Sequence, residues 1–159
     1  MKTAKEEARR ERTRRTMYHT LIFVALAISA GRIAVVSSAN GDTAFLSAND
    51  RSRWCTVASL VEHGTFAIDQ QDAISDPVMR NRKPWQTIDK VRHLGSDGKQ
   101  HYYSSKPPLL PVLIAGVYKG VNLVSGMTLT EQPIYAARLV LALVNLPLLG
   151  LFYFATIYS

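Results

Sequence analysis

The chain has 159 residues, one cysteine and a net charge of +7, which allows one small soluble domain or a few membrane spans. The single cysteine, Cys55, excludes an internal disulfide and a cysteine-based zinc site, and we expect it to be a small packing residue. Nucleic-acid binding is not expected, because more than half of the excess charge lies in an N-terminal tail without aromatic residues to stack on bases.

Apolar residues are concentrated in three blocks that carry almost no charge: 18–38, 107–124 and 136–158. Each block is about 18 to 23 residues long, and a helix needs about 20 residues to cross the hydrocarbon core of a bilayer. The mean hydropathy of the chain is close to zero only because polar segments separate these blocks. The sequence therefore predicts an all-α integral membrane protein with three transmembrane helices at these positions.

Residues 1–17 form a basic tail directly before the first block. Its cations outnumber its acidic residues: Lys2, Lys5, Arg9, Arg10, Arg12, Arg14 and Arg15 stand against Glu6, Glu7 and Glu11. Basic residues beside a span are retained in the cytoplasm, so the tail is predicted to be cytoplasmic.

The first block has two interpretations. A cleaved signal peptide would have a basic start, an apolar core and small residues before the cut, for which 37–39 would serve. A retained span would place Arg32 near the outer interface, where its aliphatic stem can reach the headgroups. The long charged lead and the later apolar blocks favour a retained span at 18–38. In either case the chain from Asn40 onward is exported.

The exported loop, 39–106, is predicted to contain a short amphipathic helix. Asn49 and Asp50 can cap a helix start, and Gly64 suits a left-handed stop. Apolar residues between them fall on one face at helical spacing: Trp54, Val57, Ala58 and Val61. Such a helix either lies along the membrane surface or packs against the rest of an exported domain, and the sequence leaves both open.

A β-hairpin is predicted later in the same loop. Residues 85–94 and 99–104 have some strand preference and flank a turn-rich tetrad at 95–98. The hairpin leads to Lys106, Pro107 and Pro108. Prolines suit the first turn of a helix, so the second span is predicted to begin here.

The short connection at 125–135 is predicted to be cytoplasmic. With the tail inside, Lys119 and Arg138 also fall at the cytoplasmic side, as the positive-inside rule prefers. The third block, 136–158, reaches Ser159 with no closing tail. We therefore expect a chain truncated after residue 159, taken from a larger helical bundle.

The charged residues that flank the predicted spans form the candidate site: Asp50, Arg51, Arg53 and Lys106. Consecutive spans are usually neighbours, so these residues are expected at one extracytoplasmic rim. A carboxylate there can take a proton from an acceptor hydroxyl, and the cations can bind a phosphate leaving group. Alternatively, the cations anchor the spans and Asp50 only caps its helix. The four histidines lack metal-ligand spacing, so no histidine-based metal site is expected, whereas a divalent ion held in another way remains possible.

Four segments together resemble the start of C-type membrane glycosyltransferases, which include the aminoarabinose transferases of lipid A and the protein O-mannosyltransferases. Members of this superfamily have an acidic residue in a juxtamembrane helix after the first span, a Lys-Pro-Pro element and then an Ala-Arg-Leu element. This chain has the same order over about residues 48–149, in the segments 47–54, 58–64, 101–111 and 137–139.

The resemblance implies transfer of a sugar from a polyprenyl-phosphate carrier to an extracytoplasmic acceptor, with inversion, in a multi-pass protein of the bacterial inner membrane. Asp50 matches the catalytic acidic residue, and Lys106 matches a basic residue near the carrier phosphate. Arg51 and Arg53 are further candidates for binding the donor phosphate, and Tyr102 and Tyr103 for lining the sugar site. Many members have a second acidic residue where this chain has Arg51, which leaves the acceptor and the need for a divalent ion open.

Two other functions compete with this one. A membrane scaffold or transporter subunit would use the exported loop to bind a partner, with its charges serving only as anchors. A signal anchor that tethers an exported domain is the third alternative. This chain alone is expected to be inactive as a transferase, because three spans cannot enclose a lipid carrier. The sugar and the acceptor are not determined by the sequence.

Overall fold

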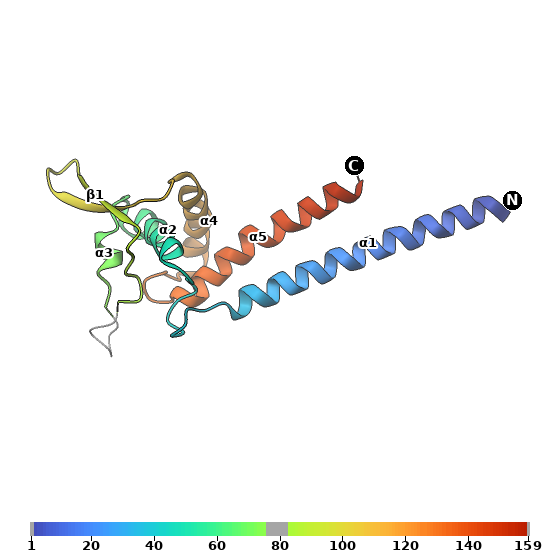
Figure 1. Cartoon of the computed structure of the whole chain (residues 1–159), viewed down its shortest axis with the longest axis horizontal. Coiled ribbons are helices and arrows are strands. Elements are labelled where there is room, and N and C mark those ends of the chain that lie inside the picture. The colour runs from blue at the N-terminus through green and yellow to red at the C-terminus, as the bar shows by residue number, and fades with distance from the viewer. Residues whose placement is uncertain (1, 76–82, 159) are drawn as a thin grey trace. The chain divides into compact units, whose positions relative to one another are not determined.

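The computed structural model describes residues 2–75 and 83–158, with side chains described for 5–75 and 83–156. The fold is mostly helical (Figure 1). Its elements are α1 (Lys2–Val35), α2 (Ala48–Ala58), η1 (Ser59–His63), α3 (Asp69–Asp72), β1 (Lys90–Leu94), β2 (Gln100–Ser104), α4 (Leu109–Ser125) and α5 (Pro133–Tyr158). They form two compact units, one comprising Met1–Val35 with Ala142–Ser159 and the other Val36–Leu141.

Two helices in the described part of the chain are long and apolar enough to cross a membrane. They are Lys5–Val35 and Pro133–Thr156. In their apolar windows 0% and 6% of the residues are buried inside the protein, so nearly all of that apolar surface is free to contact lipid. Of the three predicted spans, the first and the third thus coincide with helices that could cross a membrane. The predicted tail and first span are one continuous helix, α1, and α5 begins at Pro133, three residues before the predicted 136.

The predicted amphipathic helix forms as α2, continued by the π-helical turn η1. Its N-cap is Ser47 rather than the predicted Asn49 or Asp50, because the Ser47 hydroxyl accepts the backbone N–H of Asp50. Gly64 ends η1 with φ +68°, as predicted, since glycine adopts this left-handed conformation without steric strain.

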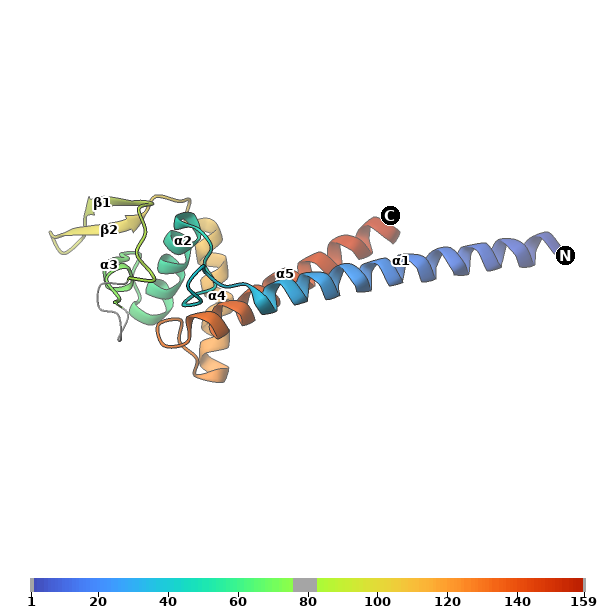
Figure 2. The same ribbon diagram turned by 60° about the horizontal axis from the view of Figure 1, so that its bottom comes forward.

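The predicted hairpin is confirmed as the two-stranded antiparallel sheet of β1 and β2 (Figure 2). Lys90 pairs with Ser104 and Leu94 with Gln100, and the Gly95 N–H donates to the Lys99 carbonyl across the turn at 2.7 Å. The first strand is shorter than predicted. Residues 85–89 instead run over α2, where Trp85 and Thr87 are buried.

The core of Val36–Leu141 is built around three aromatic side chains. Phe45 stacks on Trp54 with 5.4 Å between ring centroids and contacts Trp85 at 4.8 Å. Cys55 is fully buried beside them and its Sγ lies 3.5 Å from the Trp85 carbonyl oxygen. Burial raises the pKa of the Cys55 thiol, so it stays protonated and unreactive, which agrees with the predicted packing role.

Helix α4 packs against α2 and η1 along one face. That face carries Pro111, Ala115, Tyr118 and Val121, which are buried and fall at helical spacing. The other faces are apolar and exposed, with the side chains of Leu109 and Leu123 more than 70% accessible. At 17 residues, α4 is about 25 Å long, which is short for a membrane core of about 30 Å.

Contacts around the connection after α4 differ from the three-span prediction. The Glu62 carboxylate accepts the Leu129 N–H at 2.9 Å and the Thr130 hydroxyl at 2.6 Å. The Arg138 guanidinium donates to the Val36 carbonyl at 2.7 Å and 3.0 Å. Segments on opposite sides of a bilayer cannot hydrogen-bond to each other. The predicted cytoplasmic loop at 125–135 and the cytoplasmic position of Arg138 therefore conflict with an exported loop at 39–106.

The orientation of α4 gives the same result. Figures 1 and 2 both draw α4 running across the first turns of α5, within the unit Val36–Leu141. The predicted second span at 107–124, with Lys119 at its cytoplasmic end, is not confirmed.

Candidate functional site

Asp50 lies at the third position of α2 and its carboxylate is held by the start of the helix. Its Oδ2 accepts the Ser47 N–H at 3.2 Å and the Ser47 hydroxyl at 2.9 Å. Together with the bond from the Asp50 N–H to the Ser47 hydroxyl, this forms a reciprocal capping box. The alternative role, in which Asp50 helps to cap its helix, is thus present in the structure. The bonds engage only Oδ2, and Oδ1 accepts none from the described residues.

Lys106 follows β2 and forms an ion pair that the sequence analysis did not anticipate. Its Nζ lies 3.2 Å from Oδ1 of Asp89, and both side chains are one-quarter exposed. The hairpin register explains this pair, because Lys90 faces Ser104 and the residues just outside the strands are then brought together. Asp89 lies within the predicted first strand, 85–94, but only the register of the hairpin brings it beside Lys106.

The first turns of α2 are hydrogen-bonded to the segments that carry this ion pair. The Ser52 hydroxyl donates to the Asp89 carbonyl at 2.6 Å and lies 2.6 Å from the Ser104 hydroxyl. Arg51 Nε donates to the Gln86 carbonyl at 2.8 Å. The turn that contains Asp50 and Arg51 is therefore fixed against the chain immediately before Lys106, although more than fifty residues separate them in sequence.

A second ion pair, more buried than the first, supports the segment 86–89. Asp72 is paired with Lys90, and its other carboxylate oxygen accepts the Thr87 N–H at 2.9 Å. The Thr87 hydroxyl donates to the Ala48 carbonyl at 2.8 Å, which joins the same segment to the first residue of α2. These bonds position the backbone that presents Asp89 to Lys106.

The remaining predicted site residues are less closely connected to this centre. Arg53 is half-buried and forms no hydrogen bond or ion pair with the described residues. Tyr102 and Tyr103 are neighbours in β2 and point to opposite faces of the hairpin. Tyr102 shares its face with Ser104 and carries Lys90 over its ring at 4.6 Å. Tyr103 lines a pocket on the opposite face of the hairpin. Of the two tyrosines, Tyr102 is therefore the one on the side of the Asp50 turn.

His101 forms a separate cluster near the tip of the hairpin. Its Nδ1 lies 2.9 Å from Asp69 Oδ2, and its Nε2 lies 3.0 Å from Asp97 Oδ2. Asp69 also accepts the Tyr102 N–H at 3.0 Å. The hydrogen bond to Asp97, and to a smaller extent the one to Asp69, raises the pKa of His101. The hydrogen bond with His101 in turn lowers the pKa of Asp97.

Protonation of His101 is therefore expected to hold the hairpin tip closed. A raised pKa means that this contribution is complete below the ordinary histidine pKa of about 6.5 and is lost as the pH rises through the higher folded value. Hydrogen exchange of residues 95–101, corrected for intrinsic rates, should show more frequent opening at alkaline pH. His101→Gln should remove this dependence and His93→Gln, on the same sheet, should retain it. A dependence that survives His101→Gln would contradict the assignment.

Within the described ranges, no group of three or more His, Cys, Asp or Glu side chains is arranged to hold a metal ion. Comparisons with known protein families, curated proteins and solved structures find no match for this chain. The site itself provides a carboxylate with one uncommitted oxygen, a lysine in a partly exposed ion pair, and two arginines within one turn of the carboxylate.

Proposed function

We propose that this chain is the N-terminal part of a membrane glycosyltransferase that moves a sugar from a polyprenyl-phosphate carrier to an extracytoplasmic acceptor. The observation that carries the proposal is the direct bonding of the Asp50 turn to the segment before Lys106, through Ser52 and Ser104. Such a transfer requires a base and a phosphate-binding cation close enough together to contact the acceptor and the donor at the same time. The order of short motifs along the chain supports the same proposal.

In this mechanism Asp50 Oδ1 takes the proton of the acceptor hydroxyl. The hydroxyl oxygen then attacks the anomeric carbon opposite the phosphate, and the bond from that carbon to the phosphate oxygen breaks. The bonding electron pair leaves with the phosphate, so the configuration at the sugar is inverted. Lys106, Arg51 and Arg53 stabilise the charge on the leaving group. An arriving phosphate competes with Asp89 for Lys106, which is feasible because that pair is partly exposed.

The direct test uses the intact membrane protein in detergent or proteoliposomes with a radiolabelled polyprenyl-phosphate sugar. Transfer of label to an acceptor extract from the same membrane, with loss of label from the carrier, is the expected result. A protein that binds neither the carrier nor the sugar, but captures a defined envelope protein, would support the scaffold alternative instead.

We further infer that α1 and α5 are the two spans of this chain and that the unit Val36–Leu141 lies outside the cytoplasm. The contacts of Glu62 with Thr130 and of Arg138 with Val36 support one common side for both connections. On this topology α4 lies at the outer interface, with its exposed leucines toward lipid. Asp50 and Lys106 would then face the outer leaflet, where the phosphate of a polyprenyl carrier would be accessible to them.

Cysteine accessibility tests this topology. In a Cys55→Ala background, Gln70→Cys and Glu131→Cys should both react with a membrane-impermeant maleimide in intact cells. Ala8→Cys, in the tail, should react only after lysis. All three positions are exposed, so differences report the side of the membrane rather than burial. Protection of Glu131→Cys until lysis would restore the three-span arrangement.

A further inference from the structure

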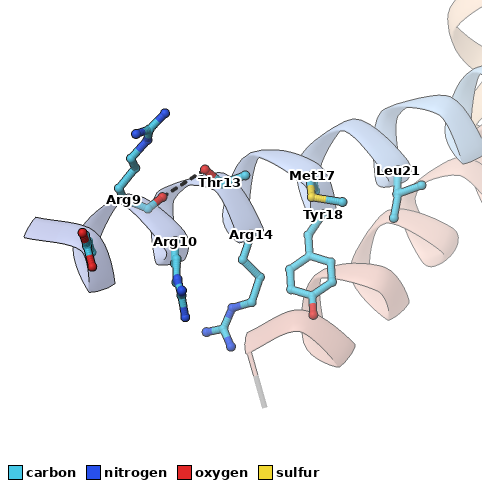
Figure 3. A pocket seen from close by; sticks show the side chains of 8 residues that line it. Arg9, Arg10, Thr13, Arg14, Met17, Tyr18 and Leu21 are labelled. Carbon is cyan, nitrogen blue, oxygen red and sulfur yellow. Dashed lines mark hydrogen bonds between the residues drawn. The ribbon is translucent and has the colours of Figure 1, made fainter. Parts of the chain in front are cut away.

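One face of α1 presents two arginines and a tyrosine in a row. Arg10, Arg14 and Tyr18 are four residues apart and point to the same side of the helix (Figure 3). Together with neighbouring side chains they line an open pocket on the helix surface: Glu6, Arg9, Thr13, Met17 and Leu21. Basic, aromatic and aliphatic side chains therefore follow one another along a single face.

The arginines of this face have no counterion among the side chains of 5–75 and 83–156. Among the described residues, no carboxylate lies within ion-pair distance of Arg9, Arg10 or Arg14. The other side of the helix differs, because Arg15 pairs with Glu11 at 2.6 Å. Like charges four residues apart on a helix repel each other, so the Arg10–Arg14 pair gains from an anion placed between them.

The position of the face along α1 suggests the source of that anion. The apolar part of the helix begins at Met17, and Arg14 lies about 5 Å below it at 1.5 Å per residue. Tyrosine rings are favoured at the level of the lipid headgroups, with the charged groups just beyond them. The order from Arg10 through Tyr18 to Leu21 then matches the order of phosphate, glycerol and acyl chain in a phospholipid.

We propose that this face of α1 binds the phosphate of an anionic phospholipid in the cytoplasmic leaflet. Arg10 and Arg14 hold the phosphodiester through charge-assisted hydrogen bonds, and the Tyr18 hydroxyl donates to a headgroup or ester oxygen. Met17 and Leu21, both about 60% exposed, contact the first part of the acyl chain. The site is separate from the proposed transfer centre and does not depend on its activity.

The test compares two double variants of the intact protein in nanodiscs. Arg10→Ala with Arg14→Ala removes the face, whereas Arg12→Ala with Arg15→Ala removes the same formal charge from the other side of the helix. Selectivity for spin-labelled phosphatidylglycerol over spin-labelled phosphatidylcholine is measured for each. The first variant should lose selectivity by about tenfold or more, because a charge-assisted hydrogen bond to the phosphate contributes at least about 1.5 kcal/mol. The second should lose much less.

Three results would overturn the proposal. Equal losses in both variants would mean that selectivity follows total charge rather than this face. Displacement of the labelled lipid by inorganic phosphate would indicate a site for free phosphate. Binding of single-stranded DNA that only the first variant loses would assign the face to nucleic acid. Tyr18→Phe adds a readout of geometry, with an expected smaller loss of phosphatidylglycerol selectivity and unchanged membrane insertion.

Discussion

Asp50→Asn is expected to reduce sugar transfer by roughly 10²–10⁴-fold, the usual contribution of general acid–base catalysis. An asparagine at this position cannot take the acceptor proton. Its amide oxygen can still accept the Ser47 N–H that the carboxylate now accepts at 3.2 Å, so the start of α2 should be preserved. Transfer is measured with the labelled polyprenyl-phosphate sugar, alongside membrane insertion and tryptophan fluorescence as tests of folding.

Ser47→Ala is the matched control for this prediction. It breaks the same capping box from the other side, removing the hydroxyl that bonds to Asp50, but it leaves the carboxylate in place. Loss of an N-cap costs about 1 kcal/mol of stability, so this variant should be slightly less stable and still active. Equal loss of transfer in both variants would show that Asp50 acts only as a cap. Full activity of Asp50→Asn would remove it from the mechanism.

Glu62→Ala is expected to destabilise the unit Val36–Leu141 by about 2 kcal/mol, because it leaves the buried Tyr118 hydroxyl without its acceptor, although the Leu129 N–H keeps its bond to the Tyr118 oxygen at 2.7 Å. The Glu62 carboxylate accepts the Tyr118 hydroxyl at 2.5 Å as well as the Leu129 N–H and the Thr130 hydroxyl. Tyr118 and Leu129 are fully buried. These bonds join η1, α4 and the connection to α5, so their loss should loosen the packing of α4.

Tryptophan fluorescence can measure this effect in the intact protein, because both tryptophans, Trp54 and Trp85, lie in the core of that unit. Glu131→Ala removes an exposed carboxylate near the same loop and should leave the unfolding transition unchanged within about 0.5 kcal/mol. In combination with Tyr118→Phe, the Glu62 variant should show strong non-additivity. An unfolding transition like that of Glu131→Ala would show that Glu62 does not hold α4.

Much of the local structure was predictable because it depends on neighbours in sequence. The apolar blocks that became α1 and α5, the Gly64 stop and the hairpin all follow from short-range patterns. The exact N-cap was missed by two or three positions, because Ser47, Asn49 and Asp50 can all cap and only the geometry of the turn selects among them. The four candidate charges were identified, whereas Asp89 and Glu62 were not, since their partners lie far away along the chain.

The amino-acid sequence by itself determined where α2, α4, α5 and the apolar part of α1 lie, and where the basic tail is, but it did not show that the tail continues α1 as a helix. Only the tertiary structure showed that one face of α4 packs against protein. Its composition suits a span, but one face packs on α2 and η1, and Glu62 and Arg138 join its flanking segments to the loop that follows α1. The physical reason is that hydropathy measures how strongly a segment avoids water, and both lipid and the protein interior satisfy that preference. A few long-range hydrogen bonds make that distinction, and hydrophobic periodicity carries no information about them.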